Sequence, residues 1–173
     1  MRVILFFDQI QAGLGGKERA NTVLGLEKGG IGSYLMFKDY FQAHGLQVIA
    51  TVYCGSDFFT ANREAVIDKI CRLIDKTHAE VLFCGPCFNY SDYVQMSIAL
   101  ALAIQERTDC QPYVMCSAEN TSLINQYQAQ LPLLKMPKKG GTGLTAALKL
   151  AAQAVSQPAA YLEAFYQSES GGV

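Results

Sequence analysis

The sequence predicts a single α/β domain built on an open, doubly wound, mostly parallel sheet of five strands. Apolar, β-branched runs alternate with stretches of helical period along most of the chain, which is the pattern of consecutive βαβ units. The 173 residues suit one core, because half of them are hydrophobic and only 17% are charged. We therefore expect a flavodoxin-like domain over residues 1–157, followed by a short helix and a flexible tail over residues 158–173.

The expected strands are short runs rich in branched apolar residues. They cover residues 3–7, 47–53, 80–83, 112–116 and 131–136. The expected helices cover residues 33–44, 62–77, 91–107, 122–128 and 142–156. In the second of these helices, Ile67, Ile70 and Ile74 form one apolar stripe that can cover a face of the sheet.

Composition and charge argue against several classes of function. The net charge is −1 and no run of basic residues could neutralise several phosphates, so we expect no nucleic-acid partner. No apolar run reaches the roughly 20 residues that cross a bilayer. The first apolar stretch lacks the small-residue cleavage site of a signal peptide, so we expect a cytoplasmic protein with no membrane partner.

The loops that follow the strands carry the candidate functional residues. In a parallel sheet the strand ends and the helix N-termini meet at one edge, where ligands bind. After the first strand, residues 8–32 form an irregular segment with seven glycines. Gly15 and Gly16 in this segment are either ligand contacts or turn residues. Its spacing matches neither a Walker loop nor a dinucleotide fingerprint, so we expect no nucleotide cofactor.

Polar residues also follow the second and fourth strands. Cys54, Asp57 and Asn62 gather after the second strand, where they either bind and react or form a turn capped by Asn62. Glu119 and Asn120 follow the fourth strand. Glu119 is a candidate ligand-binding or acid/base carboxylate facing the same edge, and its alternative role is to sit beside a helix start.

The sharpest local motif is Cys84-Gly85-Pro86-Cys87, directly after the third strand. A cysteine at a helix start has its thiolate stabilised by the helix dipole, and two intervening residues permit a disulfide. One alternative is a pair of buried thiols. Another is a zinc site shared with Cys110 and Cys116, but no second Cys-X-X-Cys motif supports it. We expect no metal, and redox-active thiols are the one cofactor-like group that the sequence suggests.

Several segments, taken together and in order, resemble a known family. They are residues 9–18 (QIQAGLGGKE), 30–32 (GIG), 49–59 (IATVYCGSDFF) with Asn62, 84–90 (CGPCFNY) with Tyr93, and Glu119-Asn120. This succession resembles the selenoprotein B component of glycine, sarcosine and betaine reductases, and the similar component of D-proline reductase. The resemblance covers roughly residues 1–155.

The resemblance implies a small-molecule-binding protein related to oxidoreductases. In those reductases a selenol cleaves the carbon–nitrogen bond of an amine-bearing substrate that a carbonyl cofactor on a partner subunit holds. Their selenocysteine lies in a C-terminal region that these 173 residues do not include. The family has alanines where Cys84 and Cys87 stand, so this dithiol either substitutes for the selenol or serves packing.

Three hypotheses for the function follow from these observations. The first is a stand-alone relative of component B in which one thiol attacks and another resolves the mixed disulfide. The second is a non-catalytic binding or assembly subunit that meets partner reductase subunits or forms a homo-oligomer. The third is a thioredoxin-like oxidoreductase, although the tryptophan usual before that motif is absent. The first assigns catalysis to Cys54, Cys84 and Cys87, and substrate binding to Gly15, Gly16, Asp57, Asn62, Asn89, Tyr93, Glu119 and Asn120.

Overall fold

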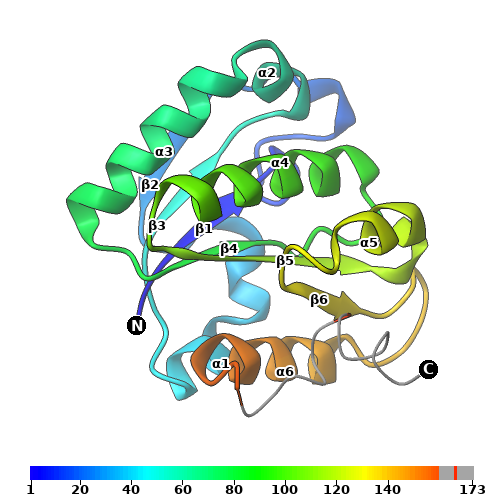
Figure 1. Cartoon of the computed structure of the whole chain (residues 1–173). Helices are drawn as coiled ribbons and strands as arrows, with labels where there is room; N and C mark the ends of the chain where they lie inside the picture. The colour runs from blue at the N-terminus through cyan, green and yellow to red at the C-terminus, as the bar shows by residue number, and fades with distance from the viewer. Residues whose placement is uncertain (160–165, 167–173) are drawn as a thin grey trace.

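The structure is a computed structural model that describes residues 1–159 and residue 166 (Figure 1). Most of the short helix and tail predicted over residues 158–173 therefore lies outside the described residues. Six strands form one sheet in the order β2-β3-β1-β4-β5-β6. They are β1 (Arg2–Phe7), β2 (Gly25–Lys28), β3 (Gln47–Tyr53), β4 (Val81–Cys84), β5 (Gln111–Ser117) and β6 (Leu133–Met136).

The parallel part of the sheet confirms the predicted fold class. Strands β3, β1, β4, β5 and β6 are all parallel neighbours and match the five predicted strands. The prediction of five strands was incomplete, because β2 adds an antiparallel strand beside β3. Its four residues, Gly25–Lys28, are partly or fully exposed, so no buried apolar run marks them in the sequence.

Helices cover both faces of the sheet. They are α1 (Lys38–Ala43), α2 (Ser56–Ala61), α3 (Arg63–Thr77), α4 (Ser91–Arg107), α5 (Thr121–Tyr127) and α6 (Leu144–Ser156). Figure 1 shows α3 and α4 above the sheet and α1 and α6 below it. The predicted helix over residues 33–44 is shorter, because residues Gly32–Met36 form a 3-10 helix before α1. Residues 56–61 were not assigned to a helix, a turn capped by Asn62 being one of the two interpretations of this segment, and they form the separate helix α2.

The central strand β1 shows how the sequence pattern builds this three-layer arrangement. Ile4 and Phe6 pack into the core under α3 and α4, whereas Val3, Leu5 and Phe7 pack into the core under α1 and α6. Alternate side chains point to opposite faces of a strand, so a strand covered on both faces is apolar throughout. Each fully buried side chain of this kind contributes about 1.5–3 kcal/mol of hydrophobic stabilisation.

The chain changes direction across the sheet between β1 and β4. The connection from β1 to β3 carries α1 on one face, while the connection from β4 to β5 carries α4 on the other. The loops after β1 and β4 therefore diverge and leave a crevice at the carboxyl ends of these strands, which is where ligands bind in such sheets. Within the part of the chain that the structure describes, no helix has the length and apolar content to cross a membrane.

Candidate functional site

A cleft of about 330 Å³ opens where the loops after β1 and β4 diverge. Its lining comes from the loop after β1, from the start of α2 and from the segment that leads into α4. The lining residues are Asp8, Gln9, Ile10, Lys17, Ala20, Ser56, Asn89, Tyr90, Ser91, Asp92 and Tyr93. We call this hollow the switch-point cleft, since it lies where the strand order reverses.

The loop after β1 is held in place by its own backbone. The amide of Ala12 donates to the carbonyl of Asp8 at 3.0 Å, and the amide of Leu14 donates to that of Gln9 at 2.9 Å. Gly13 adopts a φ of +81°, which a residue without a Cβ accepts readily. This tight turn directs the first two residues after β1 toward the cleft, where both contribute to the lining.

Asp8 is a buried carboxyl group in the lining of the cleft. It is only 4% exposed, and its Oδ1 accepts a hydrogen bond from the Gln11 amide at 2.8 Å. Burial raises the pKa of Asp8 from 3.8 to about 6, against the backbone hydrogen bonds from Gln11 and Ile10 that lower it. At neutral pH Asp8 is therefore a carboxylate that can accept hydrogen bonds or a proton, or attract a cation.

Gln9 adds an unpaired hydrogen-bond acceptor. Its side chain is 4% exposed, and Nε2 donates to the carbonyl of Gly16 at 3.1 Å. The opposite atom, Oε1, is buried and has no hydrogen-bond partner among the described residues. An unpaired buried acceptor costs about 1–3 kcal/mol, and such atoms are uncommon in folded proteins.

The same cleft also presents groups that favour an anion. Helix α4 begins at Ser91, and the first amides of a helix have no partner within the helix and carry the positive end of its dipole. Lys17 lines the cleft as well. The cleft thus combines two carboxyl groups, those of Asp8 and Asp92, with one cationic side chain and a helix N-terminus, so it presents groups of both signs.

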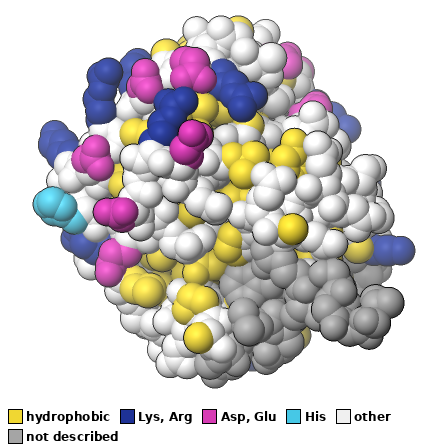
Figure 2. Space-filling view, in the orientation of Figure 1, with side chains coloured by type: hydrophobic (Ala, Val, Ile, Leu, Met, Phe, Trp, Pro, Cys, Tyr) yellow, Lys and Arg dark blue, Asp and Glu magenta, His cyan; other side chains and the backbone are white. Residues whose placement is uncertain are grey.

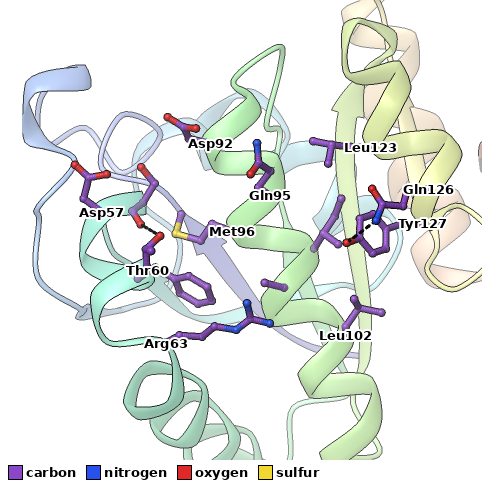
Figure 3. Close-up of a pocket in the computed structure, with 14 residues that line it drawn as sticks. Asp57, Thr60, Arg63, Asp92, Gln95, Met96, Leu102, Leu123, Gln126 and Tyr127 are labelled. Carbon is purple, nitrogen blue, oxygen red and sulfur yellow. Dashed lines mark hydrogen bonds between the residues drawn. The ribbon is translucent and has the colours of Figure 1, made fainter.

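A second hollow of about 540 Å³ adjoins the cleft and runs across α4 (Figure 3). We call it the helix groove; it shares Ser56 and Asp92 with the switch-point cleft. Figure 3 shows Arg63 at the end away from Asp92, with Met96 between them. Figure 2 shows apolar side chains reaching the surface around α4, whereas charged side chains gather over α3. The helix groove therefore has a larger volume than the cleft, and its lining combines apolar, polar and charged side chains.

The three predicted catalytic cysteines lie in the core. Cys54, Cys84 and Cys87 are fully buried free thiols. The sulfur of Cys87 lies 3.7 Å from Ser97 Oγ, and that of Cys54 lies 3.9 Å from Met96 Sδ. Burial raises the pKa of Cys54 to about 12, and it also raises the pKa values of Cys84 and Cys87. All three are therefore protonated at neutral pH.

The cysteine motif also lies outside the helix that was expected to activate it. Helix α4 begins at Ser91, beyond Cys87 in the chain, and the amide of Cys87 donates to the carbonyl of Met115 at 2.8 Å. The helix dipole acts mainly within the first turn, so it offers these thiols little stabilisation. The catalytic assignment of the cysteines stays a prediction. No group of three or more histidine, cysteine or acidic side chains suited to a metal occurs among the described residues.

Some of the predicted binding residues line the two hollows. Asn89 and Tyr93 line the switch-point cleft, and Asp57 lines the helix groove. The hydroxyl of Tyr93 donates to the carbonyl of Phe6 at 2.5 Å, which ties α4 to the end of β1. These positions agree with a binding role, although that role itself stays a prediction.

Other predicted binding residues lie outside both linings and support the loops. Gly16 accepts the hydrogen bond from Gln9, and its neighbour Gly15 has a φ of +140°. Asn62 Nδ2 donates to the carbonyl of Phe58 at 3.0 Å in its own turn. Asn120 Nδ2 donates to the carbonyl of Phe88 at 3.2 Å, and Glu119 accepts from Ser117 Oγ at 3.2 Å. These contacts fix the loops that surround the cleft.

The sequence analysis assigned no binding role to Asp8, Gln9 or Lys17, although Gln9 and Lys17 lie in the segment 9–18 that carries the family resemblance. A signal for Asp8 was available, because it directly follows the apolar run over residues 3–7 and so stands at the edge where ligands bind. Gln9 gave no such signal. Its importance depends on the burial and pairing of a single oxygen atom, which only the folded loop determines.

The sheet order and the cleft together define an α/β domain of the doubly wound class with a cleft at its switch point. Comparison with known proteins gives the family. The family model of glycine/sarcosine/betaine reductase selenoprotein B matches residues 1–170, and the chain belongs to this family. The match covers nearly all of the 173 residues and agrees with the resemblance carried by the loops.

Curated relatives are similar over part of the chain. The glycine reductase complex component B subunit gamma of Carboxydothermus hydrogenoformans is 28% identical over 103 residues, which are 60% of this chain and 23% of that protein. The sarcosine reductase complex component B subunit beta of Peptoclostridium acidaminophilum is 26% identical over 106 residues, 61% of this chain and 24% of that protein. The matched region thus spans about a quarter of each relative. No solved structure matches the chain.

Proposed function

We propose that the chain binds a small amino acid or a related amine in the switch-point cleft, as a substrate-binding subunit that acts with partner subunits of a reductase complex. One observation carries the proposal: buried acceptors on Asp8 and Gln9 share one cleft with Lys17 and the N-terminus of α4. An ammonium group suits the acceptors, and a carboxylate suits the lysine and the helix end.

The size of the cleft supports a small ligand. Small-molecule sites in proteins occupy roughly 300–1,000 Å³, and this cleft of about 330 Å³ lies at the lower end of that range. A ligand of a few heavy atoms fills such a space without displacing the surrounding loops. The names of the relatives refer to glycine and sarcosine, which are compounds of this size.

Partner subunits supply the chemistry in this proposal. The thiolate is the reactive form of cysteine, and the burial of Cys84 and Cys87 raises the pKa of both thiols. Thiol redox catalysis by this chain is therefore the less favoured function. The relatives are named as subunits of component B within reductase complexes, which supports a role in an assembly.

A titration followed by two-dimensional NMR of the isotope-labelled chain tests the proposal. Glycine and sarcosine are expected to shift the backbone amide signals of residues 8–17 and 89–93, because these segments line the cleft. Titration up to roughly 100 mM detects even a binding free energy of about −1.4 kcal/mol. If neither ligand shifts these signals, or if the shifts fall only elsewhere in the chain, the proposed function is wrong.

A further inference from the structure

We propose that the free edge of β2, together with the hollow between this strand and α3, binds an extended acidic segment of a partner protein that adds to the sheet as a further strand. The inference deepens the proposed function, since it names the chemistry of a partner, and it rests on the assembly part of that function alone. It makes no use of the switch-point cleft, which lies elsewhere on the sheet.

The backbone of β2 has an unpaired side. Among the described residues, β2 is the outermost strand of the sheet, and it pairs antiparallel with β3. In such a pair, hydrogen-bonded residues alternate with residues whose N–H and C=O groups point away from the neighbouring strand. The amide of Gly29 donates to the carbonyl of Ile49 at 3.0 Å, so Glu27, two residues earlier, also faces β3. Leu26 and Lys28 therefore point their backbone groups outward, where a further strand can pair with them.

A hollow of about 360 Å³ lies beside this edge, lined by β2, by β3 and by α3 (Figure 1). We call it the edge hollow. Its lining residues are Leu24, Gly25, Leu26, Val52, Lys69, Ile70, Arg72, Leu73 and Lys76. Leu26 pairs with Val52 across the two strands and is 54% exposed, so the apolar floor continues outward to the free edge. A strand added beside Leu26 would cover this apolar surface.

Every charged side chain that lines the edge hollow is basic. These side chains are Lys69, Arg72 and Lys76. All three are exposed and lie on one side of α3, three or four residues apart. On another side of the helix, Glu64 and Asp68 pair with Arg107 at 3.1 and 3.2 Å. Within the described part of the chain, no salt bridge involves the three basic side chains of the hollow. The hollow therefore favours a partner that brings negative charge.

The residues of β2 itself agree with this preference. Alternate side chains of a strand point to opposite faces, so Lys28 shares a face with Leu26 and Glu27 points to the other face. The positive charge of Lys28 thus stands on the same face of the strand as the edge hollow. A lysine on an edge strand opposes pairing with another basic strand, and it attracts an acidic one.

A second copy of the chain fits this surface poorly. Two β2 strands that pair antiparallel are related by a two-fold axis perpendicular to the sheet, so α3 of both copies would cover the same face. The basic side chains of both helices would then flank the junction, and no acidic side chain lines either hollow. Like charges brought together across an interface oppose association. An acidic segment instead supplies the missing counter-charges.

The free edge and the basic hollow together specify an extended partner. A segment that adds to a sheet edge gains affinity from main-chain hydrogen bonds and specificity from its alternate side chains. Every second side chain of the added strand points to the face that α3 covers. Glutamate or aspartate at these positions meets the basic side chains of α3, while the backbone pairs with Leu26 and Lys28.

Two-dimensional NMR of the isotope-labelled chain with a model peptide tests the inference. The probe is a capped peptide of about seven residues in which glutamate alternates with valine. It is expected to shift the amide signals of residues 24–28 and 69–76, and its affinity should fall as the salt concentration rises. The same peptide with lysine in place of glutamate should bind at least about tenfold more weakly.

Charge variants of the chain test the basic side of the hollow. The double variant Arg72→Gln with Lys76→Gln is expected to bind the acidic peptide about fivefold more weakly, because two surface ion pairs are lost. The matched control is Lys38→Gln with Lys149→Gln. It changes the net charge equally, but both residues are exposed on α1 and α6, over the opposite face of the sheet. The control should keep the native affinity.

A proline tests the strand pairing. The N–H of Leu26 points outward, so Leu26→Pro removes a donor for the partner without removing a hydrogen bond between β2 and β3. Leu26→Ala is its matched control, since it also shortens the side chain but keeps the N–H. The proline variant is expected to bind the acidic peptide at least about fivefold more weakly than the alanine variant.

The possible results separate this inference from the proposed function. If the acidic peptide at about 1 mM leaves the signals of residues 24–28 unchanged, or if the lysine peptide binds as tightly, the inference is wrong while ligand binding in the cleft is unaffected. The inference also fails if sedimentation shows a dimer that Leu26→Pro dissociates, because a second copy then occupies the edge. A chain that binds the peptide but neither glycine nor sarcosine keeps the inference and loses ligand binding in the cleft. The charge variants lie on the surface and stay decisive if Leu26→Pro does not fold.

Discussion

Two regions meet at the loop after β4, and they differ in what they offer a ligand. The buried thiols, Cys54, Cys84 and Cys87, lie fully inside the core as protonated groups. The switch-point cleft begins only two residues further along the chain, at Asn89, and carries acceptors, a cation and a helix end. Of two successive parts of this loop, the first therefore packs in the core and the second lines the cleft.

This difference teaches that a motif beside a site is not necessarily part of it. Cys84 ends a strand that has a parallel neighbour on each side, so its side chain can point only to a helix-covered face. Asp8 also follows a strand, but its loop folds back and the residue contributes to the lining of the cleft. The place of a residue in the folded loop, rather than its type, decides whether it lines the cleft.

The largest effect that this comparison predicts is in the reactivity of the thiols. Iodoacetamide should label Cys71 first, because Cys71 is partly exposed on α3. Cys84 and Cys87 should react roughly a thousandfold more slowly, since they become accessible only when the core opens. Mass spectrometry of timed samples measures both rates. Equal labelling of Cys87 and Cys71 in the native protein would place the motif in the accessible site.

The next largest effect concerns the turn that separates the two regions. Gly85 adopts a φ of +137°, and a Cβ there would lie 2.9 Å from the carbonyl oxygen of Met115. We expect Gly85→Ala to lower the free energy of unfolding by about 3 kcal/mol or more, from backbone strain and crowding. Urea unfolding measures the change.

Gly45→Ala is the matched control for this substitution. Gly45 also has a positive φ, +70°, but a Cβ at this residue would meet no atom of another part of the chain within 4 Å. Its cost should be about 1 kcal/mol, from the backbone conformation alone. Equal losses in the two variants would show that the close approach to Met115 does not matter.

A smaller effect, of opposite sign, is expected in the cleft. The pKa of Asp8 is about 6 in the folded protein against 3.8 for an ordinary aspartate, so the folded state binds the proton more tightly. Ionisation therefore lowers stability as the pH rises through this interval. At pH 7.5 we expect Asp8→Asn to raise the free energy of unfolding by about 2–3 kcal/mol. The gain should vanish toward pH 2.5, well below the ordinary value of 3.8, where the carboxyl is protonated in both states.

Urea unfolding of the Asp8→Asn and native proteins at several pH values measures this effect. Asp39→Asn, an exposed substitution of the same chemistry, removes an acidic side chain from the first turn of α1, so it should lower the free energy of unfolding by no more than about 1 kcal/mol and should not raise it at any pH. A loss of stability in Asp8→Asn at pH 7.5 would mean that the carboxylate is already well compensated in the free protein. That result would remove the reason for a ligand to be needed there.

The smallest effect concerns the contact that joins the two regions. Tyr93 lines the cleft, and its hydroxyl donates to the carbonyl of Phe6 in the core at 2.5 Å. We expect Tyr93→Phe to lower the free energy of unfolding by about 1 kcal/mol, the value of a buried hydrogen bond. Thermal unfolding measures it. An unchanged midpoint would show that the hydroxyl contributes nothing to the link between β1 and α4.

Much of the fold follows from the sequence, because the buried strands and the helix stripes depend on local periodicity. Val81–Cys84 and the apolar stripe of α3 lie where the pattern predicts them. Strand β2 was not predicted, because an exposed edge strand contains no run of apolar residues that would mark it in the sequence.

For the candidate site too, some features could be predicted from the sequence and others could not. Its place at the edge beyond the strand ends follows from the topology, and Asn89 and Tyr93 lie in the cleft. The pairing state of Gln9 Oε1 and the burial of Asp8 arise from contacts made by the folded loop. The redox chemistry suggested by the Cys-Gly-Pro-Cys motif requires solvent-exposed thiols. The motif itself does not indicate whether Cys84 and Cys87 are exposed or buried.

The most direct test of the account is the affinity for sarcosine of a variant in which Cys54, Cys84 and Cys87 are all alanine. Ligand binding belongs to the polar cleft in this account, so calorimetry should give the folded variant a Kd within about threefold of the native value. Asp8→Asn serves as the variant that should lose binding. A tenfold or greater loss in the folded cysteine variant, with binding retained in Asp8→Asn, would assign the site to the thiols and contradict the account.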